Sequence, residues 1–259
     1  MSNNMDAWRT SIANSDDTGI WVRGYDIPSL MTQKSFADMV FLLHQGRLPA
    51  DAERRLIDAI LVAVADHGAG APSCAATRLV ASGNRQSLSA AVAAGILAIG
   101  DEHGGAGSAC IEMISAGLAL AKRESLSIAE AACRTVEDAK ANRKRLAGLG
   151  HRVHSKDPRT DVLFEMAESG GVAGDGIAFM RAVESEAKER IKPLPINIDG
   201  ALAAVLHDLG FPPPFGKLIF IIGRVAGLTA EAAEEYQREK AMRIRIPVQY
   251  DGEPPRRVE

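Results

Sequence analysis

The chain has 259 residues, of which 46% are hydrophobic and 24% charged, as in an ordinary globular protein with one large domain or two small ones. The formal net charge is −3, whereas nucleic-acid-binding proteins are strongly basic, so we expect no nucleic-acid partner. Aromatic residues make up only 5%. Alanine and leucine must therefore fill much of the core, which favours closely packed helices.

Cysteine usage and hydropathy indicate the compartment. Cys74, Cys110 and Cys133 are scattered and form no CxxC pair, which points to a reducing compartment and to no structural zinc. Residues 1–17 are polar and carry acidic groups, unlike a signal or transit peptide. No apolar run reaches the roughly 18 residues of a membrane span. We therefore expect a soluble, cytoplasmic protein with no membrane partner.

Capping signals and apolar stripes predict helices in the N-terminal half. Residues 1–19 are predicted to be a flexible lead. Ser35 and Asp38 form a pattern like a capping box, which predicts a helix from Ser35 to about Gln45, before Gly46. Three further helices are predicted from their apolar periodicity or small-residue content, over 51–66, 73–82 and 87–99.

The C-terminal half carries similar signals. Ser127 and Glu130 form a full capping box that predicts a helix to about residue 146. Pro193 and Pro195 predict an extended segment over 193–199, because proline disfavours helix in the preceding residue. The other helices predicted here cover 108–122, 160–169, 177–190, 200–209, 215–227 and 229–242. The sequence thus predicts a nearly all-α fold with ten to twelve helices.

Three of the six histidines lie beside glycine in breaks between predicted helices. They are His67, His103 and His151. Glycine lets the backbone open and lets a ligand approach, and helix ends bring unpaired N–H groups to the same place. Asp199 lies at the start of another predicted helix. These four side chains together indicate a candidate active site.

A metal site is one alternative interpretation, since His151 and His154 are three residues apart. Arg152 and Lys156 lie beside them, and their positive field disfavours a cation. The same cluster, with Arg159, suits an anion such as a carboxylate or phosphate, or is a solvated basic turn. We therefore expect no metal.

Two other sequence patterns resemble functional motifs, but we do not interpret them as functional sites. The Gly148-Leu149-Gly150 segment is not a dinucleotide fingerprint, because no strand precedes it and the third glycine is absent from the sequence. Cys74 lies near His67, but it sits among Ala and Ser in a predicted helix. We interpret Cys74 as a structural residue and not as a nucleophile.

Taken in chain order, the breaks between helices resemble the citrate synthase superfamily over about residues 20–252. The resemblance is most specific at residues 148–153 (Gly-Leu-Gly-His-Arg-Val) with 157–159 (Asp-Pro-Arg). The other matching segments are Arg23-Gly24-Tyr25-Asp26-Ile27-Pro28, Ser35-Phe36-Ala37-Asp38, Gly46-Arg47-Leu48-Pro49, Asp66-His67, His103-Gly104-Gly105, Asn197-Ile198-Asp199-Gly200, Gly223-Arg224, and Arg245 followed by Tyr250.

The resemblance implies an all-α, citrate synthase-like fold of two domains. A large domain would comprise residues 20–106 and 206–259, and a small domain residues 107–205. The active site would lie in the cleft between them, which closes over substrate and excludes water.

The resemblance also implies the site residues. Asp199 would move the methyl proton of acetyl-CoA, His103 would hydrogen-bond the enolate oxygen, and His151 would serve the hydroxyl or ketone oxygen of the partner acid. The carboxylates of that acid would be bound by His67, Arg159, Arg224 and Arg245, and CoA by Gly148, Leu149, Gly150 and Lys156. CoA is part of the substrate, so no separate cofactor is implied.

Arg245 resembles an arginine that reaches in from a second subunit, which implies a homodimer with a shared active site. The chain is shorter than full citrate synthases. Its length and motifs resemble the stand-alone citryl-CoA lyases and the C-terminal lyase module of ATP-citrate lyase. This implies cleavage of (S)-citryl-CoA to acetyl-CoA and oxaloacetate. The alternatives are a citrate or 2-methylcitrate synthase, favoured by a histidine at 103 where one lyase lineage has Phe, and a non-catalytic helical dimer.

Overall fold

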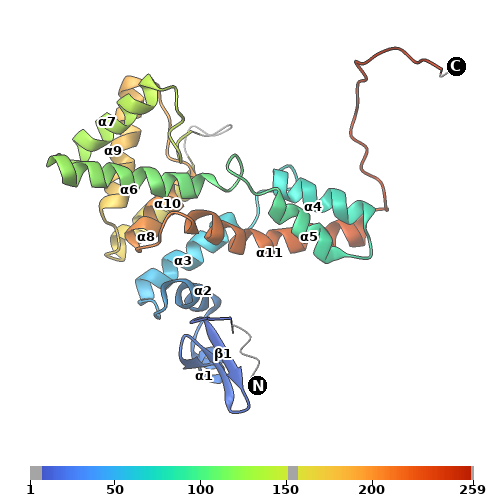
Figure 1. The fold of residues 1–259 in the computed structure, drawn as a ribbon, viewed down its shortest axis with the longest axis horizontal. Coiled ribbons are helices and arrows are strands. Elements are labelled where there is room, and N and C mark those ends of the chain that lie inside the picture. Colours follow the sequence, from blue (N-terminus) through green and yellow to red (C-terminus); the bar gives the residue numbers. More distant parts are fainter. Residues whose placement is uncertain (1–7, 151–156, 258–259) are drawn as a thin grey trace, which may run out of the picture. The chain divides into compact units, whose positions relative to one another are not determined.

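A computed structural model of the protein describes residues 8–150 and 157–257, and most of these residues are helical (Figure 1). The all-α prediction is confirmed, with eleven helices among the described residues. Their bounds are α1 Ile27–Gln33, α2 Phe36–Gln45, α3 Asp51–Val64, α4 Pro72–Gly83, α5 Leu88–Leu97, α6 Ala106–Glu124, α7 Ile128–Ala141, α8 Pro158–Ser169, α9 Asp175–Arg190, α10 Ile198–Asp208 and α11 Phe215–Arg238.

A small antiparallel sheet precedes the helices and corrects the prediction of a flexible lead up to residue 19. Its strands are β1 Ala13–Asp16, β2 Gly19–Val22 and β3 Tyr25–Asp26, in the order β1-β2-β3. The turn between β1 and β2 is held by the Asp16 carboxylate, which accepts hydrogen bonds from the Thr18 N–H at 2.8 Å and the Thr18 hydroxyl at 2.6 Å. This local bonding orders a polar segment that has no apolar pattern.

The predicted capping boxes are confirmed at Ser35 and Ser127, where α2 and α7 begin. The short helix α1 was not predicted. Its start carries a recognisable signal, since Asp26 accepts a hydrogen bond from the Ser29 N–H at 3.0 Å and Pro28 lies in the first turn.

Several helix boundaries differ from the sequence prediction by a few residues, and the largest differences are in α7 and α11. Helix α7 ends at Ala141 and not at 146, because Asn142 turns its side-chain amide back to the Asp138 carbonyl at 3.0 Å. Helix α11 is continuous, where two helices separated near residue 228 were predicted. Gly227 weakens a helix by about 1 kcal/mol. Leu228 is fully buried, and burying a leucine contributes roughly 1.5–3 kcal/mol, which more than offsets that cost.

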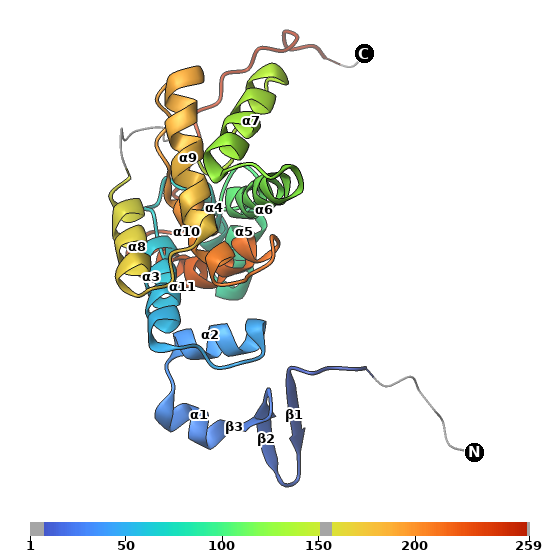
Figure 2. The same cartoon turned by 90° about the vertical axis from the view of Figure 1, so that its left-hand side faces the viewer.

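Contacts divide the chain into two compact units. The first comprises Met1–Asp66 and Ile99–Ala226. Its centre is α10, which packs against α3, α6, α8 and α9 (Figures 1 and 2). Eight of the eleven residues of α10 are buried, and the polar Asp199, His207 and Asp208 lie at its two ends. The apolar middle of this helix fixes its position, which in turn fixes where Asp199 points.

The second unit comprises His67–Ala98 and Gly227–Glu259. Here α4 and α5 pack against each other, and Arg78 on α4 forms ion pairs with Glu231, with Glu234 at 2.8 Å and with Glu235 at 3.3 Å. The boundaries of these two units differ from those of the predicted large and small domains. The predicted division into two domains on either side of a substrate cleft stays a prediction. None of the helices in the described ranges is long and apolar enough to cross a membrane.

Candidate active site

Two segments meet backbone to backbone at the start of α10. The Asn197 N–H donates to the Gly148 carbonyl at 3.0 Å, and the Gly150 N–H donates to the Pro195 carbonyl at 2.7 Å. The Asn197 side-chain amide donates to the Gly150 carbonyl at 2.8 Å. A Cβ on Gly200 would lie 2.3 Å from the Gly148 oxygen, so only glycine permits this approach. The loop at 148–150 is thereby locked to the helix that carries the predicted base.

Asp199 is the second residue of α10 and is held in an unusual environment. Its Oδ1 atom is buried and has no hydrogen-bond partner among the described residues. Burial raises the pKa of Asp199 above its ordinary value, the positive charges of Arg159 and Arg224 oppose the rise, and the negative charge of Asp157 adds to it. A helix N-terminus normally makes a carboxyl more acidic. Burial outweighs that effect here, which suits a group that both takes up and releases a proton.

Arg159, in the first turn of α8, is held by its own neighbour in the chain. Its Nε donates to Asp157 Oδ1 at 2.9 Å and its Nη2 donates to Asp157 Oδ2 at 2.8 Å. Its Nη1 donates to the Ala63 carbonyl at 3.2 Å. Of the five guanidinium N–H groups, three are thus used within the described part of the chain. Counted over the described residues, one N–H on each terminal nitrogen is left for an anion.

Arg224 on α11 is almost fully buried, with 2% exposed. Its Nε donates to the Val64 carbonyl at 2.8 Å, beside the Ala63 carbonyl that Arg159 uses. The C-terminal turn of α3 therefore binds both guanidinium groups, as expected from the negative end of a helix dipole. The Arg224 guanidinium carbon also lies 4.8 Å from the centre of the Phe220 ring.

His103 is half-buried and lies in a tight turn before α6. The Gly100 N–H donates to the His103 carbonyl and the His103 N–H donates to the Gly100 carbonyl, both at 3.0 Å. Its ring packs edge-on against Phe220, with the ring centres 6.1 Å apart. Gly104 has a positive φ of 77°, and a Cβ there would lie 2.4 Å from the Phe220 ring. Phe220 thus contacts both His103 and Arg224, and Arg224 acts electrostatically on Asp199 together with Arg159.

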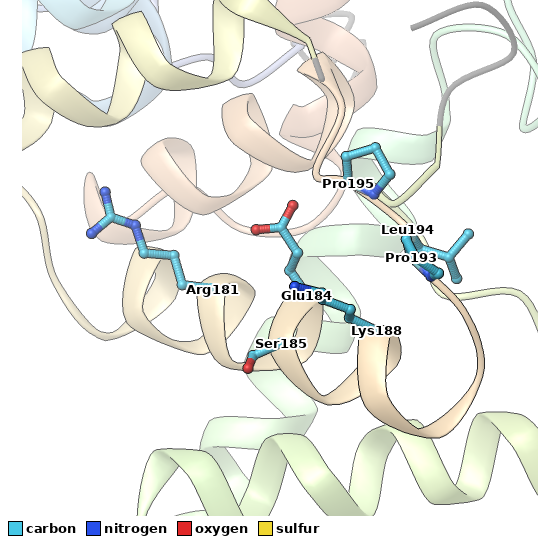
Figure 3. A pocket seen from close by; sticks show the side chains of 7 residues that line it. All are labelled: Arg181, Glu184, Ser185, Lys188, Pro193, Leu194 and Pro195. Atoms are coloured by element: carbon cyan, nitrogen blue, oxygen red, sulfur yellow. The ribbon is translucent and has the colours of Figure 1, made fainter. Parts of the chain in front are cut away.

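A pocket of about 380 Å³ borders the 148–150 loop (Figure 3). It is lined by four residues of α9 and by the extended segment that precedes α10, namely Arg181, Glu184, Ser185, Lys188, Pro193, Leu194 and Pro195. The Glu184 carboxylate accepts a hydrogen bond from the Ile196 N–H at 2.7 Å. Leu194 lies beneath the loop, 3.5 Å from where a Cβ of Gly150 would be.

The structure therefore brings Asp199, Arg159 and Arg224 close to one another in the first unit, and His103 is connected to Arg224 through Phe220. His67 and Arg245 are exposed and belong to the second unit. His151 and Lys156 lie outside the described residues. The catalytic and binding roles of all eight residues remain predictions.

Asp157 and Phe220 were not singled out in the sequence. Asp157 is quoted in the most specific motif, and an acid two residues before an arginine is a signal for a local ion pair. Phe220 lies in a purely apolar stretch of α11, and no local pattern distinguishes it from a core residue.

Cys74 and Cys110 are buried. Burial and the nearby charge of Asp199 raise the pKa of Cys110, which argues against a reactive thiolate.

Comparison with known proteins identifies the family to which this fold and these motifs belong. The family model described as "Citrate synthase, C-terminal domain" matches residues 50–245. A solved structure of citryl-CoA lyase from Hydrogenobacter thermophilus is 37% identical, has a TM-score of 0.89, and is matched over 97% of both chains. A solved ATP citrate lyase from Methanothrix soehngenii is 19% identical over 94% of this chain and 42% of its own, with a TM-score of 0.78, which supports the fold alone.

Citrate synthase of Haloferax volcanii is 30% identical over 84% of this chain and 55% of its own length. The citrate synthase of Heyndrickxia coagulans is 29% identical over 78% of this chain and 52% of its own. The chain thus spans about half the length of the curated relatives it matches. The family model covers most of the chain, and the relatives agree with it. The chain belongs to the citrate synthase family.

Proposed function

We propose that this protein is a citryl-CoA lyase, which cleaves (S)-citryl-CoA to acetyl-CoA and oxaloacetate. The observation that carries the proposal is the match to a citryl-CoA lyase over 97% of both chains at 37% identity. The curated citrate synthases of Haloferax volcanii and Heyndrickxia coagulans are matched over about half of their own length. Identity that extends over the whole of a relative is the stronger argument for a shared reaction.

In the direction of cleavage, His151 accepts the proton of the citryl hydroxyl group. The carbon–carbon bond then breaks, its electron pair stays on the acetyl-CoA fragment as an enolate, and the hydroxyl carbon becomes the ketone of oxaloacetate. His103 hydrogen-bonds the enolate oxygen, and Asp199 gives its proton to the enolate carbon. The raised pKa of Asp199 supports this role, because a carboxyl group must hold a proton before it can deliver one.

The carboxylates of the substrate would be bound by His67, Arg159, Arg224 and Arg245. Planar guanidinium groups match carboxylates in bidentate geometry. Arg159 keeps one N–H on each terminal nitrogen, counted over the described residues, and this supports such a contact. CoA would be bound by the loop at 148–150 and by Lys156. The adjoining pocket adds the cations of Arg181 and Lys188, which suit phosphate groups.

The active form would be a homodimer in which Arg245 serves the neighbouring subunit's site, and the protein would be cytoplasmic. Arg245 is exposed in the extended C-terminal segment, which supports a role outside its own fold. Mixing the inactive variants Asp199→Asn and Arg245→Ala should restore activity, because a hybrid dimer contains one site with both residues intact. Statistical exchange would restore up to about a quarter of the wild-type activity. No recovery after mass spectrometry confirms subunit exchange would contradict the shared site.

Incubation with synthetic (S)-citryl-CoA tests the reaction directly. Release of oxaloacetate and acetyl-CoA is expected, detected by malate dehydrogenase coupling and by chromatography. Release of citrate and free CoA would instead support a citrate or 2-methylcitrate synthase, the second candidate. That candidate is favoured by the histidine at 103, where one lyase lineage has Phe. No turnover in either direction, with the dimer folded, would support a non-catalytic protein.

A further inference from the structure

Asp157 is a buried carboxylate to which the reaction gives no role. Only 1% of its side chain is exposed, and it caps the start of α8. It contacts the segments that carry two of the predicted functional residues, Arg159 and Asp199. One side is the bidentate pair with the Arg159 guanidinium, at 2.9 and 2.8 Å. The other is a hydrogen bond at 3.1 Å that Asp157 Oδ2 accepts from the N–H of Ile198, the first residue of α10.

Ile198 directly precedes Asp199, so one carboxylate joins the arginine predicted to bind substrate to the turn that carries the predicted base. We propose that Asp157 is a positioning residue that orients Arg159 toward the substrate carboxylate and fixes the start of α10 beneath Asp199. This inference rests on the proposed function, because it assigns Asp157 to the geometry of that site.

The bidentate pair determines which edge of the guanidinium faces the substrate. With Nε and one Nη2 proton bound to Asp157, the N–H groups left over in the described structure lie on the two terminal nitrogens, Nη1 and Nη2. A freely rotating arginine would have to lose side-chain entropy when the substrate binds. An arginine held in advance by Asp157 loses less, which increases affinity.

Electrostatic effects also connect Asp157 with Arg159 and Asp199. Arg159 lowers the pKa of Asp157 despite burial, so Asp157 is a carboxylate at neutral pH. The negative charge of Asp157 in turn raises the pKa of Asp199. Among the described residues, the charged groups that act on Asp199 are Arg159 on α8, Arg224 on α11 and Asp157. Removing the charge of Asp157 should therefore shift the protonation of Asp199 to lower pH.

The variant Asp157→Asn tests this, because asparagine is also a good cap for α8 and changes little in shape. Oxaloacetate should bind at least tenfold more weakly, measured by calorimetry. Exchange of the acetyl-CoA methyl protons with solvent needs Asp199 unprotonated, so its rate rises with pH. In the variant this rise should move to lower pH. A role in folding alone would change neither quantity.

Asp208→Asn is the matched control. Asp208 is also buried, with 3% of its side chain exposed, and it also accepts backbone N–H groups at a helix start, but it pairs with no arginine in the described structure. This variant should keep oxaloacetate affinity and the pH profile. If Asp157→Asn behaves like Asp208→Asn in an active enzyme, the inference is overturned. If the wild-type protein neither binds oxaloacetate nor exchanges the methyl protons, the proposed function fails instead.

A paired variant covers the case in which Asp157→Asn does not fold. Arg159→Gln combined with Asp157→Asn leaves neither charge buried alone. If Asp157 acts through Arg159, adding Asp157→Asn to Arg159→Gln should weaken oxaloacetate binding by less than threefold further. A further loss of tenfold or more would mean that the two residues act independently, and would overturn the orientation of Arg159 by Asp157.

Discussion

The two ends of α10 carry the same residue type in opposite environments. Asp208 accepts three N–H groups at the start of α9, from Gly174 at 2.8 Å, Gly176 at 2.7 Å and Ile177 at 3.1 Å. Asp199, at the other end, has a buried oxygen with no hydrogen-bond partner in the described residues. Its own helix end favours an anion, whereas Asp208 sits at the end that disfavours one.

The difference shows that position on a helix does not decide how a carboxylate behaves. Asp208 is stabilised by a neighbouring helix and holds α9 and α10 together. The Oδ1 atom of Asp199 has no such donor among the described residues, and burial raises the pKa of Asp199. A buried polar atom without a partner costs about 1–3 kcal/mol, and such a cost persists where function requires it. The same protein therefore contains a carboxylate that stabilises the fold and one that is available for chemistry.

The largest expected effect is the difference in citryl-CoA cleavage between variants of the two carboxylates. Asp199→Asn should lower citryl-CoA cleavage by roughly 10²–10⁴, because an amide can neither accept nor deliver the proton. Asp208→Asn should retain activity within a few-fold, measured below its unfolding temperature. Steady-state rates at matched protein concentration check both. Activity of Asp199→Asn within a few-fold of wild type would remove Asp199 from the mechanism.

His103→Phe tests whether Asp199 acts alone on the acetyl-CoA methyl group. If His103 donates a hydrogen bond to the enolate, exchange of that group's protons should fall by roughly 10²–10³. The measurement is deuterium wash-in to acetyl-CoA, with an oxaloacetate analogue bound. Exchange within about threefold of wild type would assign the enolate to a backbone donor such as the Gly104 N–H, since the Gly105 N–H already donates to the Gly100 carbonyl at 2.9 Å.

Stability should change in opposite directions at neutral pH. Asp208→Asn should lower the free energy of unfolding by about 1–3 kcal/mol, because an amide has one acceptor oxygen for three donors. Asp199→Asn should raise it by about 1 kcal/mol, because the variant no longer buries a charged oxygen without donors. Urea unfolding at pH 7 measures both changes, and a loss of stability in Asp199→Asn would contradict the comparison.

The smallest effect is the pH dependence of that gain. The folded pKa of Asp199 is raised, so between the unfolded value near 4 and the folded value the native state binds more protons than the unfolded state. Stability is therefore lost as pH rises through this window. The advantage of Asp199→Asn should disappear below about pH 4, where both states hold the proton. An advantage that is independent of pH would mean that charge is not its cause.

Local sequence signals predicted much of the fold. Capping boxes at Ser35 and Ser127 gave the starts of α2 and α7, because a cap depends on residues within one turn. For the helix predicted over 215–227, the predicted end was wrong. Gly227 suggests a break, and only the burial of Leu228 by distant residues keeps α11 continuous.

The sequence by itself determined the helical class, the glycine breaks beside histidine and, through ordered motifs, the family. These depend on residue identity and short spacing. Only the tertiary structure decided that Oδ1 of Asp199 is buried without a partner among the described residues and that Asp157, besides its local pair with Arg159, binds the start of α10. Burial and such contacts join residues about forty positions apart. Their energies depend on distance and on exclusion of water, which no local pattern records.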